Sequence, residues 1–293
     1  MTFRGDISRS GGKARKGGGG RGMAVGGGLG GLLLVGLFVL LGGNPAQVPE
    51  LLGQGGDQAQ LETGESFDHC QTGEDANTYD DCRLYYTMFS VNEMWQEVLP
   101  AQAELQYSEP GLELFTNTTR SGCGAASAAT GPFYCPADQY AYFDLTFFDQ
   151  MRQFGGDSAP FAQMYIVAHE VGHHVQNLEG TLGLSDYNDP GADSNAVRIE
   201  LQADCYAGIW ASYADKGEDA LLEPVTEEEL DAALTTAAAV GDDNIQRRSG
   251  GEVNPESWTH GSSEQRRQAF LDGYTTGQMS SCDYLDRGVY RTT

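Results

Sequence analysis

The most uniform stretch of hydrophobic positions in the chain lies near its start. From Met23 to Gly43 no residue is charged, and residues 32–41 are apolar except for Gly36. A helix of 21 mostly apolar residues is long enough to cross the roughly 30 Å hydrocarbon core of a bilayer. The pattern therefore predicts one transmembrane helix over residues 23–43, which would bind the protein to a membrane.

The positions after residue 67 follow helical and strand patterns. Apolar residues recur at helical spacing over residues 84–102, and Pro100 indicates the end of that helix. Residues 112–115 alternate as a short strand, and residues 140–145 have the composition of a second strand. The second strand has two interpretations: it is a core strand, or it is an edge strand that pairs with an extended peptide substrate.

Three further helices are predicted in the second half of the chain. One has Pro160 in its first turn and runs to about Asn177, and another covers residues 196–213. Ser262 with Gln265 forms a capping-box pattern, which predicts that the third helix begins there. Helices and short strands in one segment indicate an α+β body.

The helix that begins at Pro160 contains the most distinctive motif of the chain. Three of the five histidines lie at positions 169, 173 and 174, within the pattern His169-Glu170-x-x-His173. Positions i and i+4 of a helix share one face, so two imidazoles there can bind one zinc ion. Glu170 points about 100° away, beside the metal, where it can accept a proton from a zinc-bound water.

The neighbourhood of this motif favours a buried helix. Between Tyr165 and Asn177 the only acidic residue is Glu170, and there is no Lys or Arg. A histidine-rich helix on the surface would be expected to carry more charges. The sequence thus predicts zinc ligands at His169 and His173. The alternative is a buried helix whose histidines only form hydrogen bonds in the core.

The third ligand of this zinc site must come from elsewhere, because a catalytic zinc usually has three protein ligands and a water. The candidates are His174, Glu200, Asp204 and His260. His174 points about 100° away from His173, so it is expected to contact a loop or the core. Glu200 and Asp204 lie four residues apart on one helix and face the same way. We expect Glu200 to bind the metal and Asp204 to accept the outer N–H of a histidine ligand. A solvated acidic face is the alternative.

His260 lies on a predicted loop just before the helix that begins at Ser262. A loop histidine in a zinc peptidase can donate a hydrogen bond to the oxyanion of the tetrahedral intermediate, which would make it a catalytic residue. It can equally be an ordinary surface histidine, and the sequence does not decide between these two roles.

Charge is distributed unevenly along the chain. The net charge is −25, yet residues 1–43 contain six basic residues and one acidic residue, a net charge of +5, which leaves −30 for the rest. An acidic body repels a phosphate backbone, so nucleic acid is not an expected partner. The basic flank before the apolar run predicts a single-pass membrane protein with a cytoplasmic N-terminus and an extracytoplasmic body. A cleaved signal peptide is the competing interpretation.

These observations divide the chain into four segments. Residues 1–22 are rich in Gly, Arg and Lys, and they are expected to form a disordered cytoplasmic head. Residues 23–43 would be the anchor, and residues 44–66, rich in Gln, Gly and Glu, would be a linker. Residues 67–293 would form the folded domain.

The six cysteines fit a body outside the cytoplasm, where disulfides persist. Two successive pairs are each separated by eleven residues, so local pairing is the simplest expectation, although fourteen other connectivities are possible. No Cys-x-x-Cys motif is present, so a zinc ribbon is not supported. The expected disulfides are Cys70–Cys82, Cys123–Cys135 and Cys205–Cys282.

Four runs of the body form a more specific pattern when they are taken together: residues 123–138, 168–176, 200–208 and 259–266. In this order they resemble the neutral zinc metallopeptidase family of bacterial membrane-anchored proteins, over about residues 67–290. The resemblance implies a zincin-like fold with Glu170 as the base. It also implies His169 and His173 as zinc ligands, with Glu200 as the third.

The sequence therefore predicts an α+β, zincin-like zinc metallopeptidase, an endopeptidase by preference, that is anchored in a membrane and acts on peptides or proteins. Its HExxH helix and a second ligand-bearing helix would hold Zn²⁺. One alternative is a non-catalytic extracytoplasmic protein with a structural zinc or a partner-binding surface. Structural zinc commonly uses cysteine ligands, and the cysteines here are expected in disulfides. A zinc amidase acting on cell-wall peptide cross-links is a further alternative.

Overall fold

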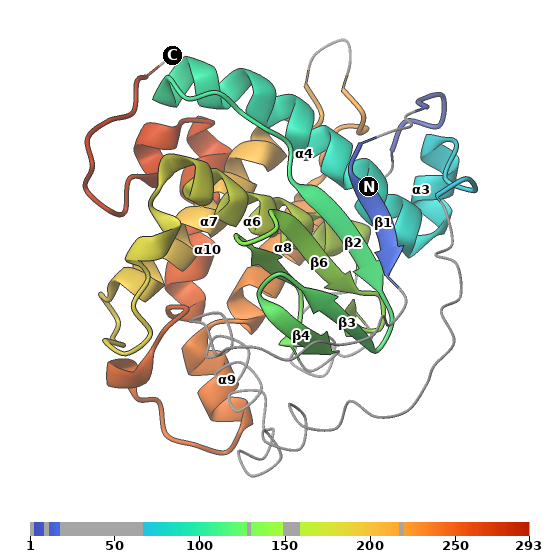
Figure 1. The fold of residues 1–293 in the computed structure, drawn as a ribbon. Coiled ribbons are helices and arrows are strands. Elements are labelled where there is room, and N and C mark those ends of the chain that lie inside the picture. Colours follow the sequence, from blue (N-terminus) through green and yellow to red (C-terminus); the bar gives the residue numbers. More distant parts are fainter. Residues whose placement is uncertain are drawn as a thin grey trace.

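The structure is a computed structural model that describes residues 3–8, 12–17, 67–127, 130–148, 159–216 and 220–292. Figure 1 shows long helices beside a small sheet, with a short hairpin next to the sheet. Helices and sheet share one large hydrophobic core, in which Trp95, Tyr165 and Trp210 are buried. This mixed architecture agrees with the predicted α+β class.

Seven α-helices and three 3-10 turns lie in the part of the chain that the structure describes. The helices are α3 (Gly73–Thr78), α4 (Asp80–Ala103), α6 (Pro160–Glu179), α7 (Asn195–Tyr213), α8 (Glu227–Ala239), α9 (Asp242–Arg248) and α10 (Ser263–Thr276), and the 3-10 turns are η4 (Leu182–Leu184), η5 (Pro255–Ser257) and η6 (Met279–Cys282).

Three helices lie close to their predicted bounds. Helix α6 has Pro160 in its first turn, and it ends before Gly180, whose φ of 72° lies in the left-handed region that favours glycine. Helix α7 covers the second predicted helix. Helix α10 begins with the predicted capping box, in which Ser262 caps the helix and the side chain of Gln265 reaches back to it.

The predicted end of α4 at Pro100 is wrong, because the helix continues to Ala103. Proline lacks a backbone N–H, but in the last turn it removes only one helical hydrogen bond. The buried side chain of Gln102 holds this turn. It accepts from the N–H of Met279 at 2.7 Å and donates to the carbonyl of Gly277 at 3.1 Å. Tertiary hydrogen bonds thus outweigh the local signal of the proline.

The main sheet has four strands in the order β1-β2-β6-β5, and β3 and β4 form a separate hairpin. Strands β1, β2 and β6 are parallel, and β5 is antiparallel to β6. The strands are β1 (Ala14–Gly17), β2 (Gly111–Phe115), β3 (Thr118–Ser121), β4 (Gly124–Ser127), β5 (Phe133–Cys135) and β6 (Tyr140–Asp144).

Strands β2 and β6 are the two strands that the sequence predicts, and β6 is a core strand. It is hydrogen-bonded to β2 on one side and to β5 on the other, and Ala141, Tyr142 and Phe143 are fully buried. The interpretation of β6 as an edge strand for substrate is therefore wrong, since it has no free edge along the paired residues. In the described sheet, β5 has a neighbour on one side only.

Part of the N-terminal head packs on the body. The side chain of Phe3 is 1% exposed, and its backbone forms an isolated bridge with Leu222. Strand β1 extends the sheet at the edge of β2. The expected disorder of residues 1–22 is therefore wrong for residues 3–8 and 12–17, because a buried aromatic side chain and a strand register hold these Gly- and Arg-rich segments.

The predicted anchor, residues 23–43, and the predicted linker, residues 44–66, lie outside the described residues. No helix in the described part of the chain is both long enough and apolar enough to cross a bilayer. The transmembrane segment therefore stays a prediction.

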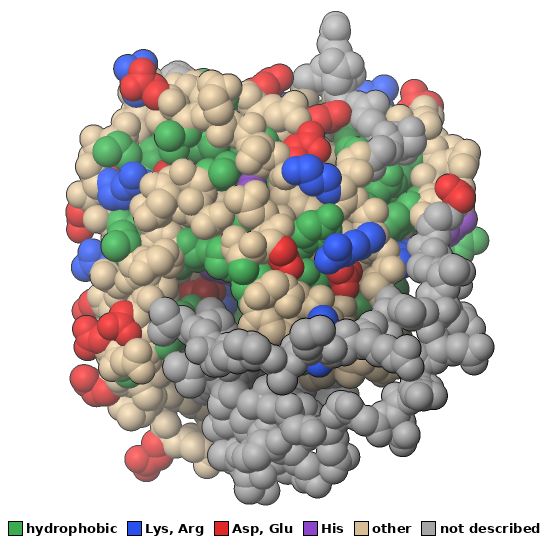
Figure 2. Space-filling view, in the orientation of Figure 1, with side chains coloured by type: hydrophobic (Ala, Val, Ile, Leu, Met, Phe, Trp, Pro, Cys, Tyr) green, Lys and Arg blue, Asp and Glu red, His purple; other side chains and the backbone are tan. Residues whose placement is uncertain are grey.

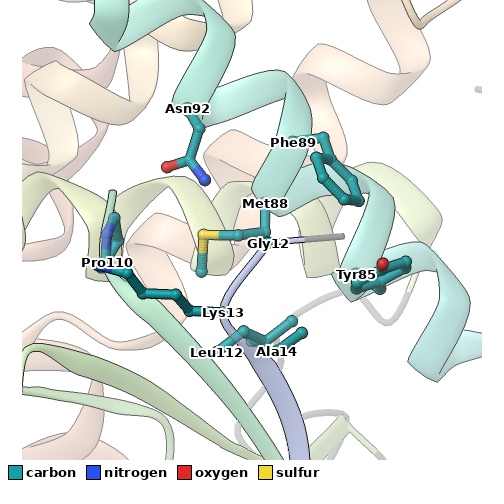
Figure 3. Close-up of a pocket in the computed structure, with 9 residues that line it drawn as sticks. All are labelled: Gly12, Lys13, Ala14, Tyr85, Met88, Phe89, Asn92, Pro110 and Leu112. Atoms are coloured by element: carbon teal, nitrogen blue, oxygen red, sulfur yellow. The ribbon is translucent and has the colours of Figure 1, made fainter. Parts of the chain in front are cut away.

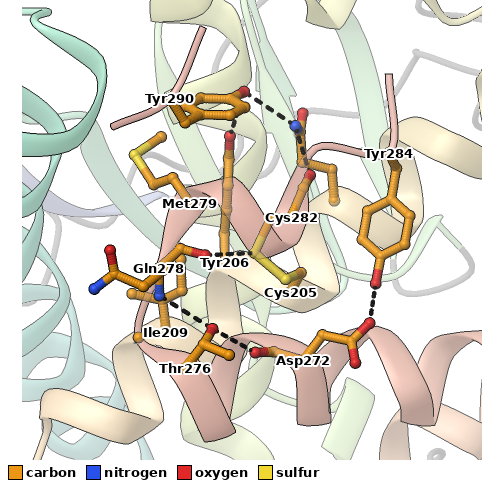
Figure 4. The surroundings of a disulfide bond; sticks show 12 residues. Cys205, Tyr206, Ile209, Asp272, Thr276, Gln278, Met279, Cys282, Tyr284 and Tyr290 are labelled. Atoms are coloured by element: carbon orange, nitrogen blue, oxygen red, sulfur yellow. Dashed lines mark hydrogen bonds between the residues drawn. A yellow bond between two sulfur atoms is a disulfide. The ribbon is translucent and has the colours of Figure 1, made fainter. Parts of the chain in front are cut away.

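The three disulfides are the three that the cysteine spacing predicts. The third, Cys205–Cys282, joins α7 to η6 (Figure 4). Beside it, the hydroxyls of Tyr206 and Tyr290 are hydrogen-bonded, and the hydroxyl of Tyr284 donates to Asp272 of α10. The C-terminal segment is thus fastened to both α7 and α10.

Helix α7 approaches α6 and α10 closely at small residues. A Cβ atom on Gly172 of α6 would lie 3.1 Å from the backbone of Ala203 in α7. A Cβ atom on Gly208 would overlap the carbonyl oxygen of Phe270, and one on Gly273 would overlap the carbonyl oxygen of Cys205. Only glycine therefore permits the observed contact between α7 and α10.

We expect Gly273→Ala to lower the free energy of unfolding by at least about 2 kcal/mol, because an added methyl group forces the two helices apart. The control is Gly183→Ala, whose added Cβ meets no atom within 4 Å and which should change stability by less than about 1 kcal/mol. Chemical denaturation followed by circular dichroism measures both. Equal stability of the two variants would contradict this packing.

Candidate metal centre

Two facing helices bring the three predicted metal ligands together. Helix α6 supplies His169 and His173, one turn apart, and α7 supplies Glu200. The Nε2 atom of His169 lies 3.5 Å from one carboxylate oxygen of Glu200, and the Nε2 atom of His173 lies 3.6 Å from the other. One donor atom from each of the three residues lies within 4.8 Å of the others.

These donor atoms suit a zinc ion. Ligand atoms bonded at about 2.0–2.1 Å to a tetrahedral zinc lie about 3.3 Å from one another. The separations of 3.5 and 3.6 Å are close to that value, and all three side chains are mostly buried. Two imidazoles and one carboxylate also form a donor set of catalytic zinc sites, which keep a fourth position for water or substrate.

The outer nitrogen of each ligand histidine has an acceptor. The Nδ1 atom of His169 lies 2.8 Å from Asp204, and that of His173 lies 2.8 Å from the amide oxygen of Gln176. The amide nitrogen of Gln176 donates to the carbonyl of Ile199 at 2.7 Å, which fixes the direction of that oxygen. When each Nδ1–H donates outward, each Nε2 can present its lone pair to a metal. Asp204 thus lies where the sequence predicts it.

Asp204 is itself held by Arg266, whose role the sequence analysis missed. The Arg266 guanidinium donates to both oxygens of the fully buried Asp204, at 2.7 and 2.9 Å, and the hydroxyl of Tyr165 donates to one of them. The sequence does contain a signal for this contact. Positions 266, 269, 270 and 273 of α10 are buried at helical spacing, so Arg266 shares the face that α10 turns to the core.

The charges of the centre shift the pKa values of its two histidines in opposite directions. Burial alone would lower the pKa of His169, but the carboxylates of Asp204 and Glu200 raise it to about 10. Burial lowers the pKa of His173 to about 4, although Glu200 opposes this shift. Burial would raise the pKa of Glu200, but His173 and His169 hold it well below its usual range. In the metal-free protein, a proton on His169 therefore balances part of the negative charge.

Glu170 lies beside the ligands and not among them. Its side chain is buried, and the backbone N–H of Tyr134 in β5 lies close enough to favour the charged carboxylate. Burial raises the pKa of Glu170 to about 7. A carboxyl group with a pKa near 7 can accept a proton in one step and return it in the next at neutral pH.

His260 lies in the loop before α10, as the sequence predicts, and Asp242 holds that loop. One oxygen of Asp242 accepts the backbone N–H groups of Thr259, His260 and Gly261, at 2.8, 2.7 and 3.0 Å. The other lies 3.3 Å from the Nδ1 atom of His260. Burial would lower the pKa of His260, but Asp242 and Glu200 raise it. The effect of Glu200 on this pKa indicates that the imidazole lies near the metal centre. The role of Asp242 had no signal in the sequence.

The contacts of His174 lie outside the metal centre. Its Nδ1 atom lies 2.8 Å from the hydroxyl of Tyr134, and its Nε2 atom lies 2.6 Å from the carbonyl oxygen of Ser108. Both nitrogens are thus used in contacts with a strand and a loop. Because these contacts tie α6 to β5, they help to keep the N–H of Tyr134 next to Glu170.

Comparison with known proteins identifies the family of the chain. The family model described as "Putative neutral zinc metallopeptidase" matches residues 5–285. The protein Rv2575 of Mycobacterium tuberculosis is 48% identical over 226 residues, which are 75% of each chain. The protein YpfJ of Escherichia coli K12 is 36% identical over 279 residues, which are 92% of each chain, and both relatives are named as uncharacterized. No solved structure matches the chain. Because the family model spans nearly the whole chain, the protein belongs to this zinc metallopeptidase family.

Proposed function

We propose that the protein is a zinc-dependent endopeptidase with a zincin-like fold that acts on peptides or proteins outside the cytoplasm. The observation that carries the proposal is the cluster of His169, His173 and Glu200 with the buried Glu170 beside it. The ligand pair on one helix and the third ligand on the next support the zincin-like arrangement. The three disulfides support the location, because disulfides persist in oxidising compartments.

Glu170 is the general base of this mechanism. Zinc, when bound, would make a water more acidic and polarise the substrate carbonyl. Glu170 accepts a proton from the attacking water on its carboxylate and then gives that proton to the leaving amine. The nearby backbone N–H of Tyr134 favours the charged form of this carboxylate, which is the form that accepts the proton.

His260 is the donor to the oxyanion. Asp242 holds the Nδ1 side of the ring, which leaves the Nε2–H to point toward the substrate carbonyl oxygen. Asp242 and Glu200 raise the pKa of His260, which favours the protonated ring that can donate from Nε2. A donor fixed before the reaction stabilises the charge that develops on the carbonyl oxygen without reorganising.

A purely structural zinc has less support. Structural sites are closed by four protein ligands and commonly include cysteine. All six cysteines of this chain are in disulfides, and the described residues supply three ligands at this centre. A position for water or substrate therefore remains.

Glu170→Gln should abolish hydrolysis of a peptide library by the full-length protein and leave about one zinc per chain, the occupancy of a single catalytic site. The amide cannot accept a proton, and residue 170 is not a ligand. Mass spectrometry of the library measures hydrolysis, and elemental analysis measures zinc. The control is Glu97→Gln, on the exposed side of α4. Undiminished hydrolysis by the Glu170→Gln variant would refute the mechanism.

Zinc binding at pH 7 should release about one proton, because the pKa of His169 is raised to about 10 in the metal-free protein and zinc requires the neutral imidazole. Zinc affinity should therefore fall as the pH falls below about 10, the pKa of His169. Titration calorimetry in buffers of different ionisation enthalpy counts the protons. The Asp204→Asn variant should release fewer protons on zinc binding, and it should bind zinc about 10–100-fold more weakly. Binding without proton release would show that His169 is already neutral.

His260→Ala should lower kcat by about 10²–10³ and leave zinc affinity nearly unchanged, because His260 stabilises the oxyanion and is not a ligand. Steady-state kinetics on a cleaved library peptide, with zinc affinity measured separately, test this. His69→Ala is the control, since the His69 side chain is 43% exposed. A loss of zinc affinity that matches the loss of activity would instead make His260 a structural residue.

A further inference from the structure

The edge of β2 carries a second strand that comes from the N-terminal head. Strand β1 pairs in parallel from Ala14 opposite Leu112 to Gly17 opposite Phe115. The N–H of Leu112 also donates to the carbonyl of Lys13 at 2.9 Å. Without residues 13–17, this edge of the central sheet would present unpaired backbone groups.

Residues 12–14 also pack against α4 (Figure 3). Tyr85, Met88 and Phe89 of α4 line the crevice between that helix and the head segment. Gly12 has a φ of 75°, and a Cβ there would lie 3.6 Å from the ring of Phe89. The segment is therefore enclosed by the sheet on one side and by a helix on the other.

Further hydrogen bonds hold residues 3–8, which precede β1 in the chain. The backbone N–H of Phe3 donates to the side chain of Asn77 at 2.7 Å, and the amide of Asn77 donates back to the carbonyl of Phe3 at 3.0 Å. The N–H of Arg4 donates to the carbonyl of Leu221, and the N–H of Gly73 donates to the carbonyl of Ile7. These contacts join the head to α3 and to the segment before α8, both far from it in sequence.

Charge complementarity gives this docking its specificity. Glu113 of β2 is 3% exposed, and Arg15 donates to it at 2.6 Å while the Arg15 guanidinium lies 4.2 Å from the centre of the Tyr140 ring. Lys16 forms an ion pair with Asp81 at 2.8 Å. Figure 2 shows Lys and Arg side chains beside acidic ones on the face that carries β1 and β2. Glu113 also accepts from the hydroxyl of Thr119, and Arg15 supplies the opposite charge, so removing Arg15 would leave the buried negative charge uncompensated.

These contacts conflict with a single membrane span between the head and the body. A helix that crosses a bilayer once over residues 23–43 would put residues 3–17 and residues 67–292 on opposite sides, where β1 and β2 cannot pair. We propose that the edge of β2, with Glu113, and the start of α4, with Asp81, are the docking site of residues 12–17 in the working protein. The head therefore lies on the same side of the membrane as the body, and not across it.

Thiol labelling of the full-length protein in intact cells tests this topology. Every cysteine of the chain is in a disulfide, so an introduced cysteine provides a single thiol. Gly5→Cys reports on the head and Gly183→Cys on the body, since both positions are exposed and an added Cβ meets no atom within 4 Å.

A membrane-impermeant maleimide is applied before and after permeabilisation. We expect both cysteines to react under the same condition. Reaction of Gly183→Cys in intact cells, with Gly5→Cys reacting only after permeabilisation, would overturn the proposal. Loss of the Gly5 peptide from the mature protein, measured by mass spectrometry, would overturn it as well.

Thermal unfolding of the purified full-length protein supplies a second test that needs no membrane. Arg15→Ala should lower the unfolding midpoint by roughly 2–4 °C, and adding Glu113→Gln should restore part of the loss. The control is Arg120→Ala, exposed on β3, which should leave the midpoint unchanged. Equal midpoints for Arg15→Ala and Arg120→Ala would show that the head does not dock on β2.

Discussion

The ion pair between Asp204 and Arg266 is the interaction on which the arrangement of the metal centre depends. Both side chains are almost completely buried, and a buried charge is tolerated only when it is paired and fully hydrogen-bonded. Asp204 meets this requirement through Arg266, His169 and Tyr165. These partners come from α10 and α6, so the pair forms only where these two helices and α7 meet. The helix packing that pairs these charges therefore also sets the distance between α6 and α7, the two helices that carry the candidate ligands.

That condition explains the small residues around the pair. Arg266 can reach Asp204 only if α10 lies against α7, and Gly208 and Gly273 remove the side chains that would keep these helices apart. Gly172 opposite Ala203 has the same effect between α6 and α7. Larger residues there would push the helices apart and separate the carboxylate from its partners. The protein would then lose stability, and the metal site would be distorted as well.

The local part of the site could be predicted from the sequence, and the long-range part could not. His169 and His173 are recognisable because their spacing of four is a property of one helix. Glu200 could be identified by the same spacing rule, because Glu200 and Asp204 lie one turn apart on one helix and face the same way. The strands β2 and β6 and the three disulfides followed from composition and spacing in the same way.

The residues that were missed act across long distances in the chain. Arg266 lies 62 positions from Asp204, and Asp242 lies 18 positions from His260. A sequence pattern shows that such a residue faces the core, but not which partner it meets there. Strand β1 is the extreme case, because its partner β2 is about a hundred positions away, and its Gly- and Arg-rich composition is that of a disordered segment.

The partner of Asp204 also decides how strongly a metal at this centre would act on substrate. A carboxylate behind a histidine ligand makes that ligand more basic, and the added negative charge weakens the pull of the metal on electrons. Here Arg266 offsets the charge of Asp204, and it also lies 3.9 Å from Glu200. Behind His173 the acceptor is the neutral amide of Gln176. In the described cluster, Glu200 is therefore the residue whose negative charge would face a metal directly, so a doubly charged cation would keep a net positive charge with which to polarise a carbonyl group.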